Sequence, residues 1–340
     1  MFAPSRHGYT NNNNNPDITS PTIMRIILIT PAPPQSRAGN RATATRWAYI
    51  LRSLGHRVEI ATSYTGQNAD LMIALHAWRS AESIRQFSDA FHRRPLIVAI
   101  TGTDAYRFIH SHPDTTLQSI KLADYLVGLH DLIANTLPQN ERRKLSVIYQ
   151  SAQPIGKREP YKRYFHVSVM GHLRDEKDPM RPAMAVRNLP ASSRIKVHHY
   201  GKAHTPEYAK QAQAEMHTNT RYQWHGEIAH HKIRQVYRRT HLLVLPSRME
   251  GGANVISEAI VAGVPVIASG IEGSIGLLGG DYAGYYAVEN EQALSALLLK
   301  AETDTAYYKK LQQACMARKP LFTIENETSG WRDLLKKVSQ

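Results

Sequence analysis

The stretch SRMEGGANVISEAIVAGVPVIAS, residues 247–269, places two glutamates beside a loop that is almost without side chains. The apolar run HLLVLPS that leads into it predicts a buried strand. Residues 254–262 predict a helix with Asn254 as its N-cap and Gly263 just past its end. The run VPVIAS then predicts the next strand. This order of strand, glycine-rich loop, helix and strand is typical of a parallel βαβ unit.

The same alternation of short apolar runs and amphipathic stretches extends along the chain. Strands are predicted at residues 25–30, 57–62, 70–76, 95–101, 124–129 and 144–150, and again at 165–171, 195–201, 222–227, 241–247 and 264–269. Between the first two strands, an apolar stripe that ends at Gly55 predicts a helix. Strands separated by helical segments predict parallel sheets, and therefore the α/β class.

The length of 340 residues exceeds one ordinary core and suits two domains. We predict a disordered extension at 1–23, a first Rossmann-like domain at 24–152, a polar linker at 153–163, a second such domain at 164–319 and a final helix at 320–340. Two doubly wound domains leave a cleft between the carboxyl ends of their sheets, where ligands bind.

The composition narrows the function classes. The 42 basic and 28 acidic residues give a net charge of +14, which favours acidic ligands. The basic residues are scattered and no nucleic-acid motif occurs, so small phosphorylated ligands are expected rather than nucleic acid. The 17 histidines show no metal-ligand spacing, and we expect neither a metal nor another cofactor. The single Cys315 and the lack of a leader or a long apolar run predict a cytoplasmic protein without stable membrane association.

The opening stretch has the chemistry of an anion site between two hydrogen-bond acceptors. Backbone N–H groups that are uncovered at a helix N-terminus bind phosphates. The residues predicted to hold a diphosphate in this way are Gly251, Gly252, Ala253 and Asn254. Glu250 and Glu258 would accept hydrogen bonds from sugar hydroxyls. The alternative is that Glu258 only favours the helix dipole and Glu250 is a solvated loop charge.

Two glutamates eight positions apart after a strand that ends in PS, followed by EAIVAGVPVIAS, resemble the nucleotide-sugar glycosyltransferases of GT-B fold. The resemblance implies that Glu250 contacts the donor sugar and that Glu258 holds the ribose hydroxyls. The segment VMGHLRDEKDP resembles the family motif whose cations neutralise the leaving diphosphate. It implies this role for Lys177 and, because His172 stands at the usual arginine position, for Arg174.

The segment YQWHGEI resembles the part of these enzymes that reads the base through its main chain. This implies donor contacts by Glu227 and Ile228. Trp224 in the same segment is more often a core residue than a stacking platform.

The first domain should bind the acceptor. A helix N-terminus and guanidinium groups that converge there predict a small-anion site, although an ordinary capped helix is the alternative. Its residues are Gly39, Asn40, Arg41, Thr43 and Arg46. The segment ITGTDAYR ends another strand, at the place where related enzymes have a histidine-glycine motif. Its candidate acceptor residues are Thr101, Gly102, Thr103 and Asp104.

Motifs such as SRAGNRATATRW, TGTDAYR, VIYQSA and GLLGGDYAGYY resemble the selenosugar synthases of selenoneine biosynthesis over nearly all of residues 24–335. The resemblance implies transfer of N-acetylglucosamine from UDP-N-acetylglucosamine to selenophosphate, with formation of a C–Se bond and release of UDP. An ionised selenium nucleophile would not strictly require a general base.

Two other functions stay open. One is a glycosyltransferase with a lipid or polysaccharide acceptor, for which residues 81–95 would form a basic amphipathic face. The other is a non-catalytic protein that binds sugar nucleotides or nucleic acid. The sequence does not indicate an oligomeric state or the anomeric outcome.

Overall fold

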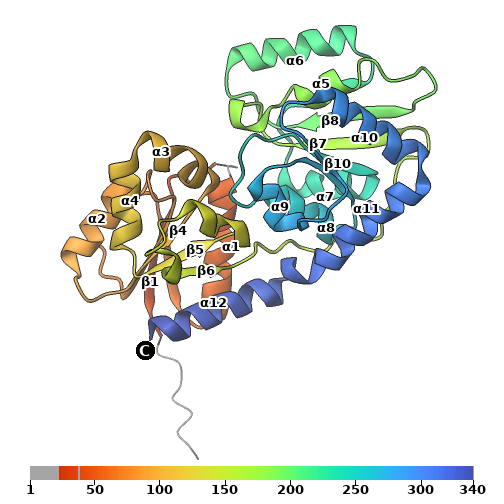
Figure 1. Cartoon of the computed structure of the whole chain (residues 1–340). Coiled ribbons are helices and arrows are strands. Elements are labelled where there is room, and N and C mark those ends of the chain that lie inside the picture. Colours follow the sequence, from red (N-terminus) through yellow and green to blue (C-terminus); the bar gives the residue numbers. More distant parts are fainter. Residues whose placement is uncertain (1–22, 37–38, 340) are drawn as a thin grey trace, which may run out of the picture.

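A computed structural model describes residues 23–36 and 39–339. The predicted extension at 1–23 lies outside these residues apart from Ile23. The described chain contains two six-stranded parallel sheets, each covered by helices (Figure 1). The predicted α/β class with two Rossmann-like domains is therefore confirmed.

The first sheet has the strand order β2-β1-β3-β4-β5-β6, and all of its pairs are parallel. Its strands are β1 (Arg25–Ile29), β2 (Arg57–Ala61), β3 (Leu71–Leu75), β4 (Leu96–Ala99), β5 (Tyr125–Gly128) and β6 (Leu145–Val147). In β1, Ile27 and Ile29 enter one core cluster, whereas Ile26 and Leu28 enter another. Because strand side chains alternate between faces, both faces of this sheet are buried.

The helical segments of the first half lie between these strands. They are α1 (Gly39–Ser53), α2 (Ala81–Ala90), the π-helical turn η1 (Asp104–Phe108), α3 (Ile109–Ser111), α4 (Pro113–Leu122), and the 3₁₀ turns η2 (Asp131–Thr136) and η3 (Arg142–Lys144). Helix α1 ends at Ser53, two residues before the predicted cap residue Gly55, whose φ of 94° suits a residue without a Cβ.

The second sheet has the order β12-β11-β10-β7-β8-β9, again with parallel pairs. Its strands are β7 (Phe165–Met170), β8 (Ile195–Tyr200), β9 (Tyr222–Trp224), β10 (Leu242–Leu245), β11 (Val266–Ser269) and β12 (Tyr285–Tyr286). Its helical segments are η4 (Asp175–Lys177), α5 (Arg181–Ala185), α6 (Pro206–Thr218), α7 (His230–Arg239), α8 (Asn254–Val261), α9 (Glu272–Leu278), α10 (Glu291–Thr303) and α11 (Thr305–Arg318). The sequence predicted every strand of this sheet except β12.

The strand order reverses once in each sheet. The reversal lies between β1 and β3 in the first sheet and between β7 and β10 in the second. Ligands of open parallel sheets bind outside the carboxyl ends of the strands at such a point. The loops that follow these four strands are therefore the places to look for a site.

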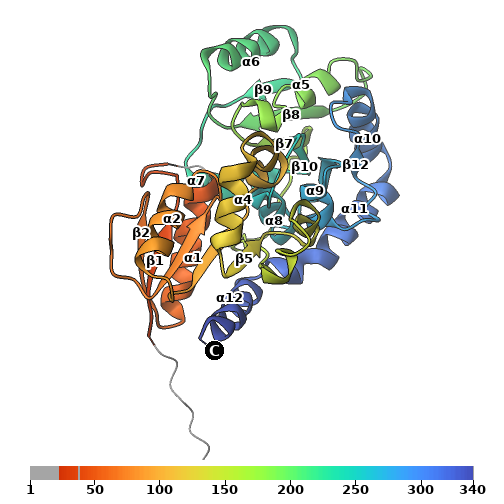
Figure 2. The same ribbon diagram turned by 60° about the vertical axis from the view of Figure 1, so that its left-hand side comes forward.

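The chain crosses between the domains twice. The predicted linker at 153–163 runs along the second domain, where the Glu159 amide donates to Arg238 O at 2.9 Å. After η5 (Lys319–Phe322), helix α12 (Ile324–Val338) returns to the first domain, as Figures 1 and 2 show in dark blue. There Trp331 packs edge-on against Trp47 of α1, with ring centroids 4.8 Å apart. The last helix therefore belongs to the core of the first domain.

Candidate active site

Two loops at the switch point of the second sheet carry the charges that were predicted for the donor site. Lys177 ends η4, which follows β7, and Glu250 lies in the loop after β10. Their side chains form an ion pair. Ser247 Oγ also donates to the Glu250 carboxylate, at 2.6 Å. These contacts hold a mostly buried carboxylate and an ammonium group side by side, where a sugar and a diphosphate would meet.

The second predicted cation, Arg174, lies just before η4. Its guanidinium is 3.8 Å from Glu176 rather than beside Glu250. Glu176 also accepts from Arg107, which comes from η1 of the first domain, at 3.1 Å. Arg174 therefore lies where the donor loop meets the first domain, and its contact with a diphosphate stays a prediction.

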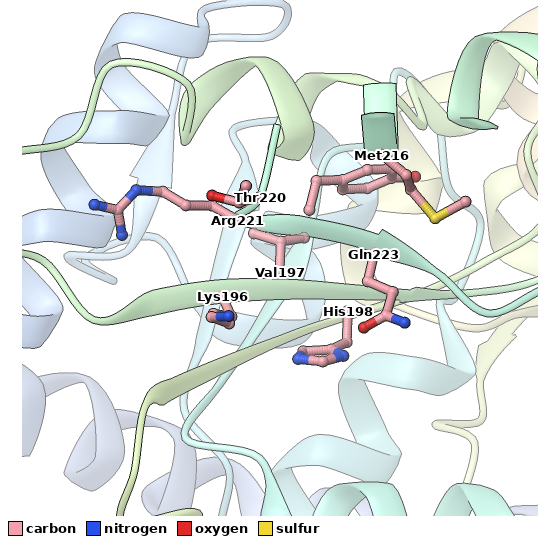
Figure 3. Close-up of a pocket in the computed structure, with 8 residues that line it drawn as sticks. Lys196, Val197, His198, Met216, Thr220, Arg221 and Gln223 are labelled. Carbon is pink, nitrogen blue, oxygen red and sulfur yellow. The ribbon is translucent and has the colours of Figure 1, made fainter. Parts of the chain in front are cut away.

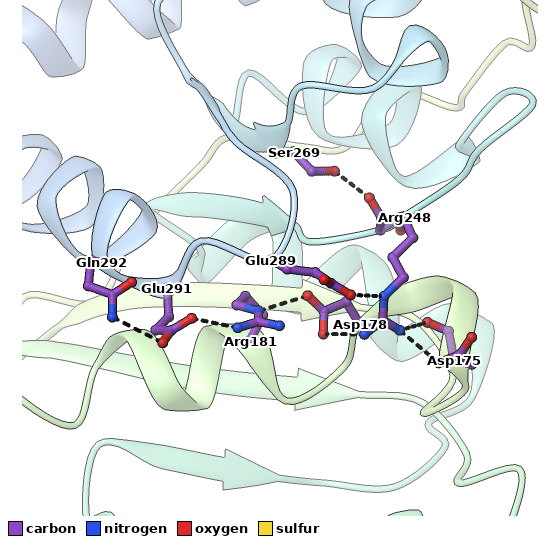
Figure 4. Close-up of polar contacts among 9 residues, drawn as sticks. Asp175, Asp178, Arg181, Arg248, Ser269, Glu289, Glu291 and Gln292 are labelled. Carbon is purple, nitrogen blue, oxygen red and sulfur yellow. Dashed lines mark hydrogen bonds and ion pairs between the residues drawn. The ribbon is translucent and has the colours of Figure 1, made fainter.

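Arg248 binds the turn η4, which ends at Lys177. Figure 4 shows its side chain beside Asp175, Asp178 and Glu289. Its backbone N–H donates to Glu176 O at 2.9 Å, and its guanidinium pairs with Asp175 at 2.8 Å. It also reaches Asp178, at 3.4 Å, and Glu289. Since one side chain from the loop after β10 binds the loop after β7 at several points, the two donor loops form one unit.

The predicted diphosphate loop leads into α8. The helix begins at Asn254, so the cap position belongs to Ala253, one residue before the predicted cap. Among the described residues, no side chain caps α8. Its first amides and those of Gly251 and Gly252 therefore suit an anionic group.

Glu258 lies one turn into α8 and is partly buried. Tyr237 donates a hydrogen bond to its Oε2 at 3.1 Å. Burial raises the pKa of the Glu258 carboxyl from 4.5 to about 7, while Tyr237 and the charge of Arg46 oppose the rise. A carboxyl group with such a raised pKa is typical of a functional position.

Replacing Glu258 by glutamine is expected to stabilise the protein at pH 8 but not at pH 4.5. Because the pKa is raised in the folded state, the stabilisation from the bound proton is complete below 4.5 and is lost as the pH rises through 7. Glutamine avoids that loss, which amounts to about 2 kcal/mol after solvent screening. Urea denaturation of both proteins at the two pH values measures the difference. An equal effect at both would contradict the pKa shift.

The predicted base-reading residues Glu227 and Ile228 lie between β9 and α7, and Glu227 is exposed. Trp224 is partly buried and packs against the core of the second domain. Its indole N–H donates to Gly201 O at 2.8 Å. This packing agrees with a structural role for the tryptophan and leaves the base contacts as a prediction.

The start of α1 faces the donor loop. The first turn of this helix, which is described throughout, contains no acidic residue. A Cβ at Gly39 would lie 3.9 Å from the side-chain nitrogen of Asn254. Asn40 and Arg41 are partly exposed beside it. The predicted anion-binding end of α1 and the predicted diphosphate loop are therefore neighbours.

Two of the predicted acceptor residues on α1 instead bind the segments that cross between the domains. Arg46 donates to Glu327 of α12 at 3.0 Å. The amide of Gln150 accepts from Thr43 at 2.7 Å and from Arg46 at 3.2 Å, and donates to Asn254 Oδ1 at 2.7 Å. Thr43 is buried within this network. Thr43 and Arg46 therefore hold α1 against the donor loop, and their contact with the acceptor stays a prediction.

The segment after β4 meets the donor loop at two glycines. A Cβ on Gly102 would lie 2.4 Å from the backbone nitrogen of Gly251, so neither position can carry a side chain at this approach. Thr101 and Thr103 are partly exposed beside this contact. Asp104 is buried and accepts from the amides of Ala77 and Trp78, each at 3.0 Å. Asp104 therefore positions the loop rather than offering a free oxygen to an acceptor.

Sequence reasoning missed four residues that organise the site. They are His76, Gln150, Arg248 and Glu327. His76 directly follows a strand at the switch point of the first sheet, and this position was the available signal. The other three are recognisable only by their partners in the fold.

A pocket that Figure 3 shows lies elsewhere. It is lined by residues such as Lys196, His198 and Arg221, near the amino ends of β8 and β9. Parallel sheets bind ligands at the opposite ends of their strands, so this pocket is not the expected site. Over residues 23–36 and 39–339, no three His, Cys, Asp or Glu side chains gather as a metal site requires. No helix of that part is long and apolar enough to span a bilayer.

Residues 153–318 match the family model described as glycosyl transferases group 1. No curated protein sequence gives a significant match. Among solved structures, that of Anabaena HepE in complex with UDP and glucose has a TM-score of 0.74 at 16% identity, over 92% of this chain and 100% of that one. Sucrose-phosphate synthase from Thermosynechococcus elongatus has a TM-score of 0.73 at 15% identity, over 92% and 98%.

Staphylococcus aureus TarM, solved with UDP and alpha-GlcNAc-glycerol, has a TM-score of 0.62 at 14% identity, over 78% of this chain and 55% of that one. These likenesses confirm the GT-B architecture. The match of residues 153–318 to the group 1 model indicates glycosyltransferase activity.

Proposed function

We propose that this glycosyltransferase transfers N-acetylglucosamine from UDP-N-acetylglucosamine to selenophosphate, forms a C–Se bond and releases UDP. The observation that carries the proposal is the meeting of two anion-suited elements, the start of α1 and the loop before α8. Gly39 and Asn254 lie side by side there. One element would take the diphosphate of the donor and the other a small anionic acceptor.

The donor assignment draws support from solved enzymes of the same architecture. HepE was solved with UDP-glucose and TarM with UDP. On this basis Glu258 binds ribose hydroxyls, the loop amides bind the diphosphate, and Glu227 and Ile228 contact the base. Lys177 and Arg174 stabilise the charge that grows on the leaving UDP. Glu250 binds the donor sugar, and no metal is needed for these steps.

The acceptor assignment rests on the selenosugar synthase motifs and on the chemistry of α1. Gly39, Asn40 and Arg41 offer amides and a guanidinium to a small anion, and Thr101 to Thr103 lie at the neighbouring strand end. The two domains approach closely at Gly102 and Gly251, which supports an acceptor site next to the donor site. Water would be excluded from such a junction.

The test is to incubate the purified chain with UDP-N-acetylglucosamine, with and without selenophosphate. We expect UDP release to increase at least tenfold with selenophosphate, and mass spectrometry to find a sugar–selenium product. UDP release that is equal in both reactions would overturn the acceptor assignment. Thiophosphate and glycerol phosphate serve as matched acceptor controls.

A further inference from the structure

An imidazole lies at the carboxyl end of β7, in the same corner of the candidate site as Lys177. His172 is the second residue after β7, and this strand borders the switch point of the second sheet. A Cβ on the preceding residue, Gly171, would lie 3.9 Å from Cδ of the Lys177 side chain. The side chain of His172 is partly exposed. A ligand that reaches the lysine therefore also comes close to this imidazole.

The backbone of the neighbouring loop fixes the hydrogen on the His172 imidazole. The loops after β7 and β8 are joined by two backbone hydrogen bonds. The Leu173 amide donates to Lys202 O at 2.9 Å, and the His204 amide donates to Leu173 O at 3.0 Å. Between them, the Lys202 amide donates to Nδ1 of His172 at 3.1 Å. A ring nitrogen that accepts carries no hydrogen, so the hydrogen of the neutral imidazole is on Nε2. His172 therefore offers an N–H donor at its second nitrogen.

The peptide group that precedes His172 is itself held from the core. The buried His199 donates from Nε2 to Gly171 O at 3.0 Å, since a carbonyl oxygen can only accept. The Tyr222 hydroxyl then donates to Nδ1 of His199, at 3.2 Å. A Cβ on Gly201 would lie 2.8 Å from the backbone nitrogen of His172, so the two loops are also in direct contact. The imidazole is therefore positioned before any ligand binds, as a preorganised donor requires.

The surroundings of His172 keep its imidazole neutral and favour an anionic ligand. Burial lowers the pKa of His172 below its ordinary value of 6.5. The positive charges of His204, Arg174 and Lys177 lower this pKa further. Glu227 acts in the opposite direction and raises it. Positively charged groups thus outnumber the single carboxylate around the ring, and this surplus attracts a negatively charged group to the exposed corner.

We propose that His172 is a catalytic residue that donates a hydrogen bond from Nε2 to the diphosphate of the donor, beside Lys177. As a lone pair of the acceptor atom forms the bond to the anomeric carbon, the C–O bond to the diphosphate breaks. UDP leaves with that electron pair, and the negative charge on its outer phosphate grows. The hydrogen bond from His172 therefore strengthens during the reaction. His172 keeps its hydrogen throughout, and His199 is a positioning residue.

This inference rests on the donor half of the proposed function and not on the identity of the acceptor. UDP itself carries the diphosphate, so its binding probes the contact without any transfer reaction. UMP lacks the outer phosphate and serves as the matched control ligand. The two nucleotides therefore separate a contact with the outer phosphate from an effect on the rest of the donor site.

The test compares two amide variants that each keep one half of the imidazole. His172→Asn keeps an acceptor for the Lys202 amide but has no donor at the place of Nε2. His172→Gln places an N–H donor there and loses the acceptor. By calorimetry, we expect His172→Asn to raise the Kd for UDP about tenfold and to change the Kd for UMP less than about twofold. His172→Gln should raise the Kd for UDP no more than about threefold.

A residue that only joined the two loops would give the opposite order, because the Asn variant keeps the bond to Lys202. An Asn variant that binds UDP as tightly as wild type, or more tightly than the Gln variant, would overturn the inference. The control His217→Asn removes an exposed imidazole from α6 of the same domain and should change neither Kd. With UDP-N-acetylglucosamine and selenophosphate, His172→Asn should also lower kcat about 100-fold.

A measurement on the unmodified protein tests the hydrogen position even if a variant does not fold. In ¹⁵N spectra of histidine-labelled protein at pH 8, His172 should carry its hydrogen on Nε2, and this signal should shift when UDP is added but not when UMP is added. A hydrogen on Nδ1, or equal shifts with both nucleotides, would overturn the inference. If wild type binds UDP but releases none in response to selenophosphate, the acceptor assignment fails. The UDP affinities and these spectra then still decide the role of His172.

Discussion

Replacement of Lys177 by methionine is expected to lower kcat for UDP release about 100- to 1,000-fold. The ammonium lies against Glu250 at the switch point of the second sheet. In the proposed reaction, charge develops there on the leaving diphosphate. Methionine keeps most of the length of the side chain and removes its charge. Initial rates of UDP release at saturating donor measure the effect.

The control for this prediction is Lys310→Met, which removes an exposed ammonium from α11 of the same domain. It should keep wild-type kcat. Thermal unfolding of both variants reports whether the Glu250 carboxylate, left without its partner, destabilises the fold. A Lys177→Met enzyme with kcat within threefold of the control would remove the lysine from the catalytic machinery.

Replacement of Glu327 by glutamine is expected to lower the free energy of unfolding by about 3 kcal/mol, because it leaves buried donors and a guanidinium without their charged partner. The Glu327 carboxylate is fully buried and accepts from the Trp47 indole at 2.9 Å, from Arg46 at 3.0 Å and from the Ser151 amide at 2.8 Å. An amide of the same shape would turn a donor toward some of these donors. Urea denaturation followed by tryptophan fluorescence measures the change, since Trp47 and Trp331 lie in this cluster.

Glu325→Gln provides the matched control, because Glu325 lies on the same helix but is exposed. Its effect should stay within about 0.5 kcal/mol. We also expect Glu327→Gln to raise the Kd for UDP, because Arg46 links Glu327 to Gln150 and Gln150 binds Asn254 of the donor loop. Equal stabilities of the two variants would show that α12 is held by its apolar face alone.

The local pattern of the chain was sufficient for the fold and for the position of the donor loop. Apolar runs such as RIILIT and LLVL form buried parallel strands because only short, uniformly apolar segments suit a sheet that is covered on both faces. The glycines around Glu250 end at a helix start because they follow such a strand directly. The cap of α8 is Ala253, one residue before the predicted Asn254. Strand β12 is only two residues long, which is too short for a recognisable apolar pattern.

The protein partners of the predicted acceptor residues were not readable from the sequence, for a physical reason. Thr43, Arg46 and Asp104 were chosen because polar groups near helix and strand ends bind small anions. In the fold, each of these side chains meets a protein partner that is distant in sequence. Arg46 and Glu327, for example, are 281 positions apart.

The sequence by itself determined two doubly wound domains, a glycine-rich loop between two glutamates in residues 247–269, and a net positive charge suited to anionic ligands. These follow from periodicity and from neighbours along the chain. The tertiary structure alone decided that Arg248 binds the turn that ends at Lys177, that α12 joins the first domain, and that His76 lies beside both Asp104 and Thr103. Such pairings depend on which strands become neighbours, because a side chain finds its hydrogen-bond partner across the fold and not along the sequence.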